Sequence, residues 1–338
     1  MTQQHQPDTI TSGAFTGHLL YSGNKTGFAY LALDWLSTFK LDIVKNNTFY
    51  NNYECTLRRH LIPYFQDRPI SEITTSDIQK YFKGKKDELS LETLVKHKNC
   101  LTSIFDVAVD DGLREKTPIT KRIRLSSTIP PAKKIIWTPM QYEIAWQFAK
   151  QHQNGLDIMV LMETGMTRSE LLGLTWADYD HKTAILRLED GLALCKNPHT
   201  GQAELIHDKL KNKYREREIP LSKELNGCLY LKPKVARTAT GVIITKHIFH
   251  APQGGPYSPD NWYKRVLKKF MRDLHEEYPD IPILTTHELR HTAATYLARH
   301  KKIDLLSLAD LLGHKDLKML RERYIHPDTN ALRDALGF

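Results

Sequence analysis

The stretch THELRHTAATYLARHKKIDLLSLADLLGHKDLKMLRERYIH, residues 286–326, contains the polar side chains from which the rest of the chain can be interpreted. His287 and Arg290 lie three residues apart in a predicted helix, so they are neighbours on one face of it. His314 follows a glycine, which is a typical helix stop because glycine readily adopts the left-handed conformation. Tyr324 comes ten residues later, shortly before a proline. These four side chains form one candidate site.

The same residues resemble the catalytic boxes of tyrosine recombinases of the phage-integrase type. In that family the second box reads H-x-x-R, the third reads L-G-H or L-G-W, and a tyrosine nucleophile follows. The matching residues here are HELR at 287–290, LGH at 312–314 and Tyr324. The resemblance implies a two-domain clamp that is mainly α-helical with a small antiparallel β-sheet. One domain is a helical core-binding bundle, and the other is the mixed α/β catalytic domain.

The position of the tyrosine departs from the family pattern by one residue. The family usually places it nine residues after the third-box histidine, whereas Tyr324 lies ten residues after His314. One extra residue rotates a helical position by about 100°, so we expect the local backbone to differ here. Tyr296 is the other tyrosine of this region, and the alanines and leucine around it predict that it packs in the core.

Composition favours a polyanionic partner. Lys and Arg total 48 against 39 Asp and Glu, which gives a net charge of +9, and basic side chains bind nucleic acid by displacing its counterions. A length of 338 residues suits two domains, and no apolar run approaches the roughly 20 residues that span a bilayer. The 4 cysteines form no C-x-x-C pair, which argues against zinc and disulfides and for a reducing cytosol.

Composition divides the chain into four parts, and the resemblance gives three of them a role. Residues 1–24 are polar and are expected to form a flexible tail, and residues 25–118 have the helical periodicity of the family's SAM-like core-binding domain. Residues 119–137 form a basic linker, in which prolines provide stiffness and cations can follow a phosphate backbone. Residues 138–338 are expected to form the catalytic domain.

Within the core-binding domain we expect four helices, the second ending near Pro63 and the fourth at Gly112. Basic residues of this domain and of the linker are candidate DNA contacts, and an ordinary solvated side chain is the alternative for any one of them. The candidates are Lys83, Lys85, Lys96, His97, Lys98, Lys121, Arg122, Lys133 and Lys134.

The first box departs from the family pattern at its central position. The family reads T-G-L/M-R-x-S/G-E-L, and TGMTRSEL at 164–171 matches it at Gly165 and at Glu170, which the resemblance implies supports the basic cluster. Thr167 stands where the family has its first catalytic arginine, and Arg168 occupies the next, variable position.

The chemistry of the family explains why this arginine matters. Attack on a phosphodiester without a metal passes through a phosphorane-like state, whose charge two guanidiniums balance by bidentate hydrogen bonds. Losing one such donor typically costs about 10²–10³ in rate. Arg168 can substitute only if the loop rearranges, because a helical neighbour points about 100° away. We therefore expect either a substituted, cleavage-deficient form or a naturally impaired recombinase.

Residues 203–221, AELIHDKLKNKYREREIPL, predict a hairpin that resembles the lysine-bearing hairpin of the family. The family pattern T-K-N…R-x-V/I-P-L implies that Lys211 is the general acid. Lys209 and Lys213 are rival choices because hairpin registers shift easily, and an exposed strand lysine is nearly as good an explanation for each of the three.

The resemblance implies the following mechanism. Tyr324 attacks a DNA phosphate and forms a 3′-phosphotyrosyl link, while Lys211 protonates the leaving 5′ oxygen. Arg290 and His314 bind the nonbridging oxygens, and His287 assists proton transfer at the tyrosine. The covalent link retains the bond energy, so the reaction needs no metal, ATP or other cofactor.

The implied partners are double-stranded DNA recombination sites and three further copies of the chain, which complete strand exchange in a homotetramer. An accessory DNA-bending or directionality factor is a further candidate partner, and no membrane partner is expected. A protein of this kind is expected to be bacterial or phage-encoded, cytoplasmic and nucleoid-associated.

Two alternative functions remain open from the sequence. The first is a DNA-binding regulator of the same fold that no longer cuts, which Thr167 and the shifted Tyr324 favour. The second is a relaxase of the type IB topoisomerase kind, which shares the tyrosine chemistry.

Overall fold

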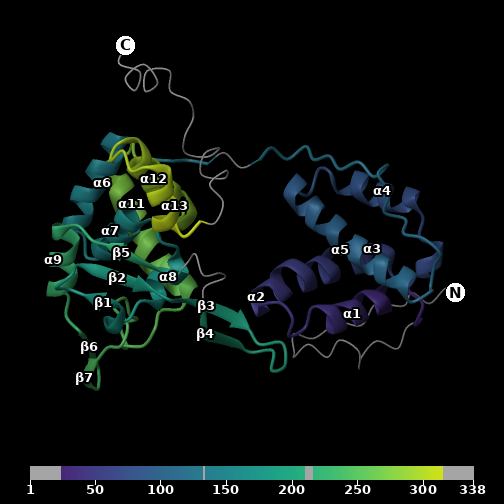
Figure 1. Cartoon of the computed structure of the whole chain (residues 1–338), viewed down its shortest axis with the longest axis horizontal. Coiled ribbons are helices and arrows are strands. Elements are labelled where there is room, and N and C mark those ends of the chain that lie inside the picture. The colour runs from purple at the N-terminus through teal and green to yellow at the C-terminus, as the bar shows by residue number, and fades with distance from the viewer. Residues whose placement is uncertain (1–23, 132–133, 210–215, 315–338) are drawn as a thin grey trace, which may run out of the picture. The chain divides into compact units, whose positions relative to one another are not determined.

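The computed structural model describes residues 24–131, 134–209 and 216–314, and Figure 1 shows the order of their helices and strands. These residues form two compact units. The first comprises residues up to 131 together with Cys195–Glu204, and the second comprises the other described residues from Lys134 onward. The predicted fold class is confirmed, because helices predominate and the strands form small antiparallel sheets.

The first unit is a helical bundle around an aromatic core. The ring of Phe28 lies 4.8 Å from that of Phe65 and 6.2 Å from that of Phe105, measured between centroids, and all three side chains are buried. Burying such rings stabilises a small bundle because each removes a large apolar area from water. The helices are α1 (Phe28–Phe39), a continuous helical run over 46–65 that includes α2 (Asn46–Thr48) and α3 (Ile62–Phe65), α4 (Thr75–Lys85) and α5 (Leu91–Asp110).

The second helical run ends two residues after Pro63, so its predicted end near Pro63 is confirmed, although the proline lies within the run and does not itself stop it. The run continues to Phe65, and Gln66 then adopts a φ of 51°. Pro63 lies in the first turn of α3, directly after a π-helical turn over Leu57–Leu61. We attribute its tolerance to that wider turn, which relieves the clash of the proline ring with the preceding carbonyl groups. The predicted end of α5 is confirmed, because Gly112 follows it with a φ of 73°.

In the second unit the central helix is α7 (Gly155–Thr164). It is buried on nearly every side, including Ile158, Val160 and Met162, and it packs against α6 and α12. Because a helix with apolar residues on nearly every side must be covered on those sides, α7 fixes the segments that surround it. The other helices are α6 (Pro139–Gln151), α8 (Arg168–Gly173), α9 (Lys223–Leu231), α10 (Pro259–Trp262), a π-helical turn (Tyr263–Leu267), α11 (Lys268–Glu277), α12 (Thr286–Arg299) and α13 (Leu305–Leu312).

Short strands complete the second unit. Two neighbours of the antiparallel sheet β1-β2-β5 bury their contact, because Leu186 on β2 pairs with Ile219 on β5 and both are buried. The predicted hairpin of residues 203–221 is corrected in its pairing: among the described residues β4 pairs with β3, whereas β5 pairs with β2. The strands are β1 (Tyr179–Asp180), β2 (Ile185–Leu188), β3 (Asp190–Lys196), β4 (Ala203–Lys209), β5 (Arg217–Pro220), β6 (Val235–Thr238) and β7 (Gly241–Ile244).

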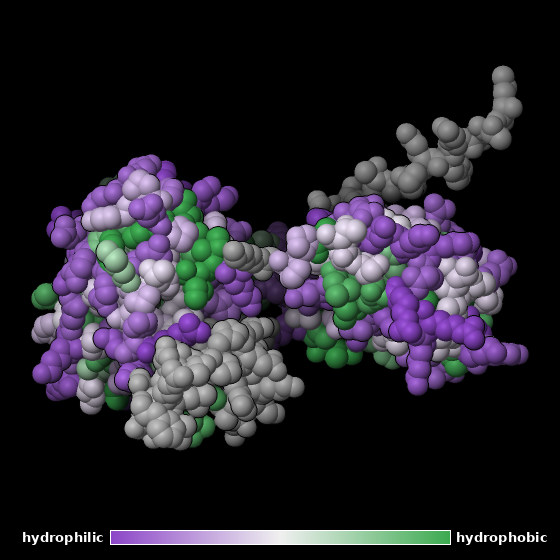
Figure 2. Space-filling model, turned by 90° about the horizontal axis from the view of Figure 1, so that it is seen from above, coloured by the Kyte–Doolittle hydropathy of each residue, from purple (hydrophilic) through white to green (hydrophobic). Residues whose placement is uncertain are grey.

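Tyr296 packs in the core of the second unit, as predicted. Its ring stacks on that of Tyr142 with centroids 3.8 Å apart, and its hydroxyl donates to Glu143. Polar side chains cover most of the face seen in Figure 2. Within the described part of the chain, every helix is too short or too polar to span a bilayer.

Candidate active site

The turn between α7 and α8 requires a glycine. Gly165 ends α7 in the left-handed conformation with a φ of 61°. A Cβ at this position would lie 2.6 Å from Cδ2 of Leu312, at the end of α13. The absence of a side chain therefore permits both the backbone turn and the close approach of α13.

Thr167 caps the helix that follows this turn. Its hydroxyl accepts a hydrogen bond from the backbone N–H of Glu170 at 3.4 Å, and the carboxylate of Glu170 accepts one from the N–H of Thr167 at 2.7 Å. This reciprocal capping box satisfies two N–H groups that the start of a helix leaves without intrahelical partners. The residue at the family's arginine position thus has a local structural task in this chain.

Arg168 is engaged elsewhere. Its guanidinium donates to the carbonyl of Pro259, the first residue of α10, at 3.3 Å. The side chain therefore contacts α10 in this structure, and the substitution for the missing arginine that the sequence left open would require the loop to move.

Glu170 is a buried carboxylate held between two arginines. It is 1% exposed, and Nη1 of Arg217 donates to its Oε1 at 3.1 Å while Nη2 of Arg217 approaches its Oε2 at 3.3 Å. Nη1 of Arg290 lies 3.9 Å from Oε2. Burial raises the pKa of Glu170, but the charge and hydrogen bonds of Arg217, the N–H of Thr167 and the charge of Arg290 together hold the pKa below its ordinary value. Glu170 is therefore ionised at neutral pH.

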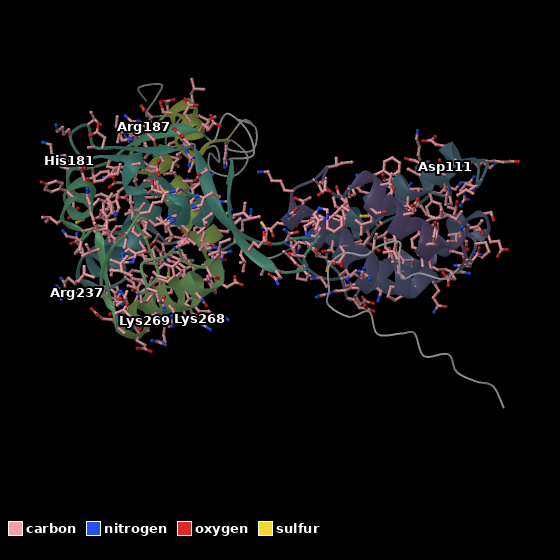
Figure 3. All side chains as sticks on the ribbon, turned by 90° about the horizontal axis from the view of Figure 1, so that it is seen from below. Asp111, His181, Arg187, Arg237, Lys268 and Lys269 are labelled. Carbon is pink, nitrogen blue, oxygen red and sulfur yellow. The ribbon has the colours of Figure 1, made fainter. Side chains whose placement is uncertain are left out.

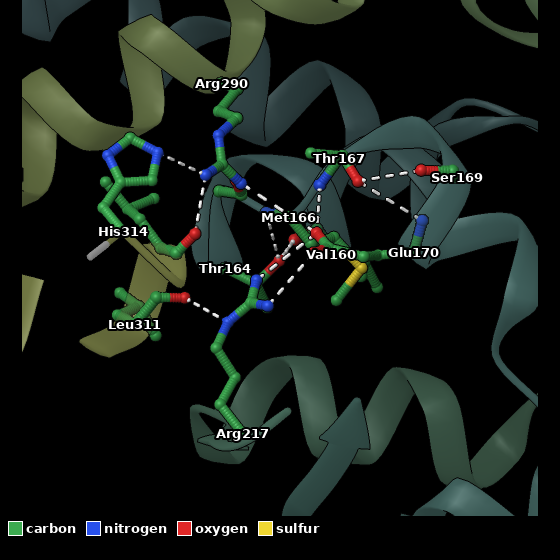
Figure 4. A network of polar contacts seen from close by, with 12 residues as sticks. Val160, Thr164, Met166, Thr167, Ser169, Glu170, Arg217, Arg290, Leu311 and His314 are labelled. Atoms are coloured by element: carbon green, nitrogen blue, oxygen red, sulfur yellow. Dashed lines mark hydrogen bonds and ion pairs between the residues drawn. The ribbon is translucent and has the colours of Figure 1, made fainter. Parts of the chain in front are cut away.

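Arg290, on α12, joins three segments of the chain. Its Nη1 donates to the carbonyl of Gly165 at 2.6 Å, and its Nη2 donates to the carbonyl of Leu312 at 2.6 Å. Nη2 also lies 2.8 Å from Nε2 of His314. A guanidinium donates hydrogen bonds and accepts none, so Nε2 is the acceptor and the imidazole is neutral with its proton on Nδ1. Figure 4 shows this convergence of Arg290, His314, Glu170 and Arg217.

His314 is positioned by the end of α13. Gly313 closes the helix with a φ of 66°, and the N–H of His314 donates to the carbonyl of Ala309 at 2.9 Å. This pattern is the one by which a glycine-capped helix satisfies its last carbonyl groups. The sequence L-G-H thus places the imidazole directly after the helix stop, beside Arg290.

The remaining predicted catalytic residues have different placements. His287 is exposed on the first turn of α12, with its ring edge-on to His291 at 5.9 Å between centroids. Lys209 is the last residue of β4. Tyr324, Lys211 and its rival Lys213 lie outside the described residues.

Most of the predicted DNA contacts are surface residues, but one is not. His97 is 1% exposed and its Nδ1 lies 2.7 Å from the hydroxyl of Tyr81, so its ring is not accessible to a phosphate and that prediction is wrong. Its helix turns it toward the aromatic core, because it follows the buried Leu94 at a spacing of three. Two of the other candidates are half-buried, Lys85 and Lys98, and Lys85 pairs with Glu88 at 2.5 Å. Lys133 lies outside the described residues. The exposed candidates are Lys83, Lys96, Lys121, Arg122 and Lys134.

Arg217 is the residue of this cluster that the sequence did not single out as functional. It begins β5, its side chain is 6% exposed, and its Nε donates to the carbonyl of Leu311 at 2.7 Å. The available signal was its place in the R-x-I-P-L part of the hairpin pattern. A strand residue far from Glu170 in the sequence gives no indication that it meets that carboxylate.

Comparison with known proteins identifies the family. The model of the phage integrase family matches residues 138–331, more than half of the chain, and the model of the phage integrase N-terminal SAM-like domain matches residues 28–86. The chain belongs to the phage integrase family. The resemblance drawn from its catalytic boxes is thereby confirmed.

Several curated proteins resemble this phage integrase family member at low identity. The tyrosine recombinase XerC-like protein of Caldanaerobacter subterraneus subsp. tengcongensis is 27% identical over 283 residues, covering 76% of this chain and 68% of that protein. The transposase from transposon Tn916 of Enterococcus faecalis is 23% identical and covers 77% of this chain and 64% of its own length. The ICEBs1 integrase of Bacillus subtilis is 24% identical, and the match covers 88% of this chain and 78% of that protein.

Solved integrase structures share the fold. The Tn1549 transposon integrase in complex with a circular intermediate DNA superposes with a TM-score of 0.73 at 22% identity, covering 91% of this chain and 97% of that one. A lambda integrase dimer bound to a COC′ core site gives a TM-score of 0.62 at 18% identity, and the match covers 89% of this chain and 79% of that one. At these identities the likeness concerns the fold alone.

Proposed function

We propose that this family member is a site-specific recombinase, which cuts and rejoins double-stranded DNA through a 3′-phosphotyrosyl intermediate on Tyr324. The observation that carries the proposal is the convergence of Arg290, His314 and Glu170 in one buried cluster. A guanidinium held in place before substrate arrives is suited to a phosphate whose negative charge increases during attack. The reaction therefore uses charge that the fold has already positioned.

In the proposed reaction the oxygen of Tyr324 bonds to a DNA phosphorus as the bond to the 5′ oxygen breaks. His287 takes the tyrosine proton, Lys211 protonates the leaving oxygen, and Arg290 and His314 bind the nonbridging oxygens. To donate to the phosphate, the ring of His314 must give up the contact of Nε2 with Arg290 and carry a proton on that nitrogen. Each side chain then has a single task. Reversal with a new 5′ hydroxyl rejoins the DNA without consumption of a cofactor.

Cleavage in this proposal is slower than in a chain with an arginine at position 167. Thr167 provides neither positive charge nor a bidentate donor, and its hydroxyl accepts from the N–H of Glu170. Removal of one preorganised donor typically lowers a rate by about 10²–10³. The capping contact explains how the fold accommodates threonine here, because threonine is among the preferred residues at the start of a helix.

The proposed partners are duplex recombination sites and a homotetramer, with an accessory DNA-bending or directionality factor. The DNA complexes of the Tn1549 integrase and the tetramer of lambda integrase on a Holliday junction support this by analogy of fold. The proposal also assigns residues 25–118 to DNA binding, 119–137 to the linker and 138–338 to catalysis.

A trapping assay tests the function. Nicked duplexes from the ends of the encoding element lose a short strand after cleavage, so the phosphotyrosyl adduct accumulates and can be resolved by denaturing electrophoresis. We expect an adduct with the natural chain, more with Thr167→Arg, and none with Tyr324→Phe.

Two other outcomes would decide for the alternatives. Sequence-specific binding without an adduct from the natural chain or from Thr167→Arg supports a non-cleaving regulator, which the capping task of Thr167 favours. Relaxation of any supercoiled plasmid by a monomer, without a defined site, supports a type IB topoisomerase-like relaxase.

A further inference from the structure

Arg217 and Arg290 approach the same carboxylate from different elements, and they do so at different distances. Arg217 on β5 lies 3.1 Å from Oε1 of Glu170, whereas Arg290 on α12 lies 3.9 Å from Oε2. All three side chains are buried or nearly so, with Glu170 at 1% exposure. In such an environment a carboxylate requires a partner, because an unpaired buried charge is costly.

The geometry shows which arginine satisfies that requirement. Arg217 makes a forked contact to both oxygens of Glu170, at 3.1 and 3.3 Å. Arg290 makes its shorter contacts to the carbonyl groups of Gly165 and Leu312, each at 2.6 Å, and to His314 at 2.8 Å. Neutral acceptors do not cancel the positive charge of Arg290, whereas a close ion pair with Glu170 would cancel most of it.

Arg217 also fixes the helix end that carries the imidazole. Its Nε donates to the carbonyl of Leu311 at 2.7 Å, next to the carbonyl of Leu312 that accepts from Arg290. The last carbonyl groups of a helix have no intrahelical partners, and cationic donors there are stabilising. The two guanidiniums therefore bind the carbonyl groups of Leu311 and Leu312, the two residues directly before Gly313, and together hold the end of α13.

We propose that Arg217 is a positioning residue of the cleavage site: by occupying Glu170 it keeps the charge of Arg290 available for the DNA phosphate, and by binding Leu311 it holds the end of α13 in place. The part of this inference that concerns cleavage rests on the proposed function. Arg217 itself contacts neither the phosphate nor the leaving group.

The test compares single-turnover cleavage of the nicked duplex by Arg217→Gln, Arg217→Lys and the double variant Arg217→Gln/Glu170→Gln. With Arg217→Gln, Glu170 draws Arg290 into an ion pair, so we expect cleavage to fall on the order of 10²-fold while DNA affinity changes less than threefold. Arg217→Lys keeps the positive charge beside Glu170, so its cleavage rate should fall less than that of Arg217→Gln. Glutamine at position 170 still suits the capping box, so the double variant regains at least tenfold over Arg217→Gln.

Arg187→Gln is the matched control. Arg187 is on β2 and makes a comparable pair with Glu218 at 3.0 Å, but both side chains are largely exposed, and Figure 3 shows Arg187 at the surface. An exposed pair contributes little, so cleavage by this variant should equal that of the natural chain. Cleavage by Arg217→Gln at the natural rate, or a double variant no faster than the single one, would overturn the proposal.

If Arg217→Gln does not fold, the double variant, which leaves no buried carboxylate without its partner, is compared with the natural chain directly. A cleavage rate within tenfold of that of the natural chain supports the positioning role. A rate lower by 10²-fold overturns it, because Arg217 would then be required even when residue 170 carries no charge.

A second readout requires no cleavage and so separates this inference from the proposed function. NMR signals of the Arg290 side chain and the His314 ring should shift in Arg217→Gln and return toward their natural positions in the double variant. Unchanged signals in Arg217→Gln would overturn the inference even for an active enzyme. If the natural chain forms no adduct, the proposed function fails and this measurement alone decides the positioning role.

Discussion

Nη2 of Arg290 donates to Nε2 of His314 across 2.8 Å, and the same Nη2 donates to the carbonyl of Leu312, two residues before that histidine. One guanidinium nitrogen thus fixes both the backbone before the imidazole and the ring itself. The acceptor role of Nε2 requires a neutral ring with its proton on Nδ1.

This contact predicts the tautomer of His314. In ¹⁵N-resolved NMR spectra at neutral pH, Nε2 of His314 should have the shift of an unprotonated nitrogen, and Nδ1 that of a protonated one. Arg290→Gln should abolish this preference. A protonated Nε2 in the natural chain would show that the two side chains do not make the contact.

Replacing Thr167 with arginine should raise the cleavage rate and lower the stability of the fold. Thr167→Arg restores a cationic donor, so we expect cleavage to rise by about 10²–10³. It also removes the cap of α8, which should lower the free energy of unfolding by about 1 kcal/mol. Single-turnover cleavage and chemical denaturation measure the two effects. Thr167→Ser keeps the capping hydroxyl and should change neither, and a stable, uncapped Thr167→Arg would contradict the structural role.

Gly165→Ala should destabilise the second unit. Its φ of 61° is strained for any residue with a Cβ, and the new atom would meet Cδ2 of Leu312 at 2.6 Å. We expect a loss of about 1–3 kcal/mol in denaturant unfolding. Gly227→Ala is the control, because Gly227 lies inside α9, where a Cβ would have open space within 4 Å. Alanine there should add about 0.5–1 kcal/mol, and equal effects at both sites would refute the argument.

Acid should destabilise the first unit through His97. Burial, with smaller contributions from His60, Lys85 and Lys96, lowers the pKa of His97 to about 4. The unfolded chain, with an ordinary pKa near 6.5, then binds more protons than the folded chain between about pH 4 and 6.5. Stability is therefore present above about pH 6.5 and is lost as the pH falls toward 4, by at most about 3 kcal/mol.

Urea unfolding of the natural chain between pH 7 and pH 4.5 measures this loss. His97→Gln removes the titrating ring and should flatten the part of the profile that belongs to it. An unaltered profile in His97→Gln would assign the acid sensitivity to other groups, among which His60 also has a pKa lowered by burial.

Local patterns were predictable because they depend on neighbours in the sequence. The helix stops at Gly112 and Gly313 follow from the conformational freedom of glycine. The packing of Tyr296 follows from the apolar residues around it in the sequence. Pro63 shows the limit of such rules, because the π-helical turn before it changes the backbone to which the proline must adapt.

The sequence by itself determined the family, the helical fold class and the order of the boxes that supply Glu170, Arg290 and His314. Only the tertiary structure decided that His97 faces a core, that Thr167 caps a helix and that Arg217 pairs with Glu170. A buried charge selects its partner by distance in the folded chain, and a sequence separation of 47 positions between Glu170 and Arg217 does not reveal that distance.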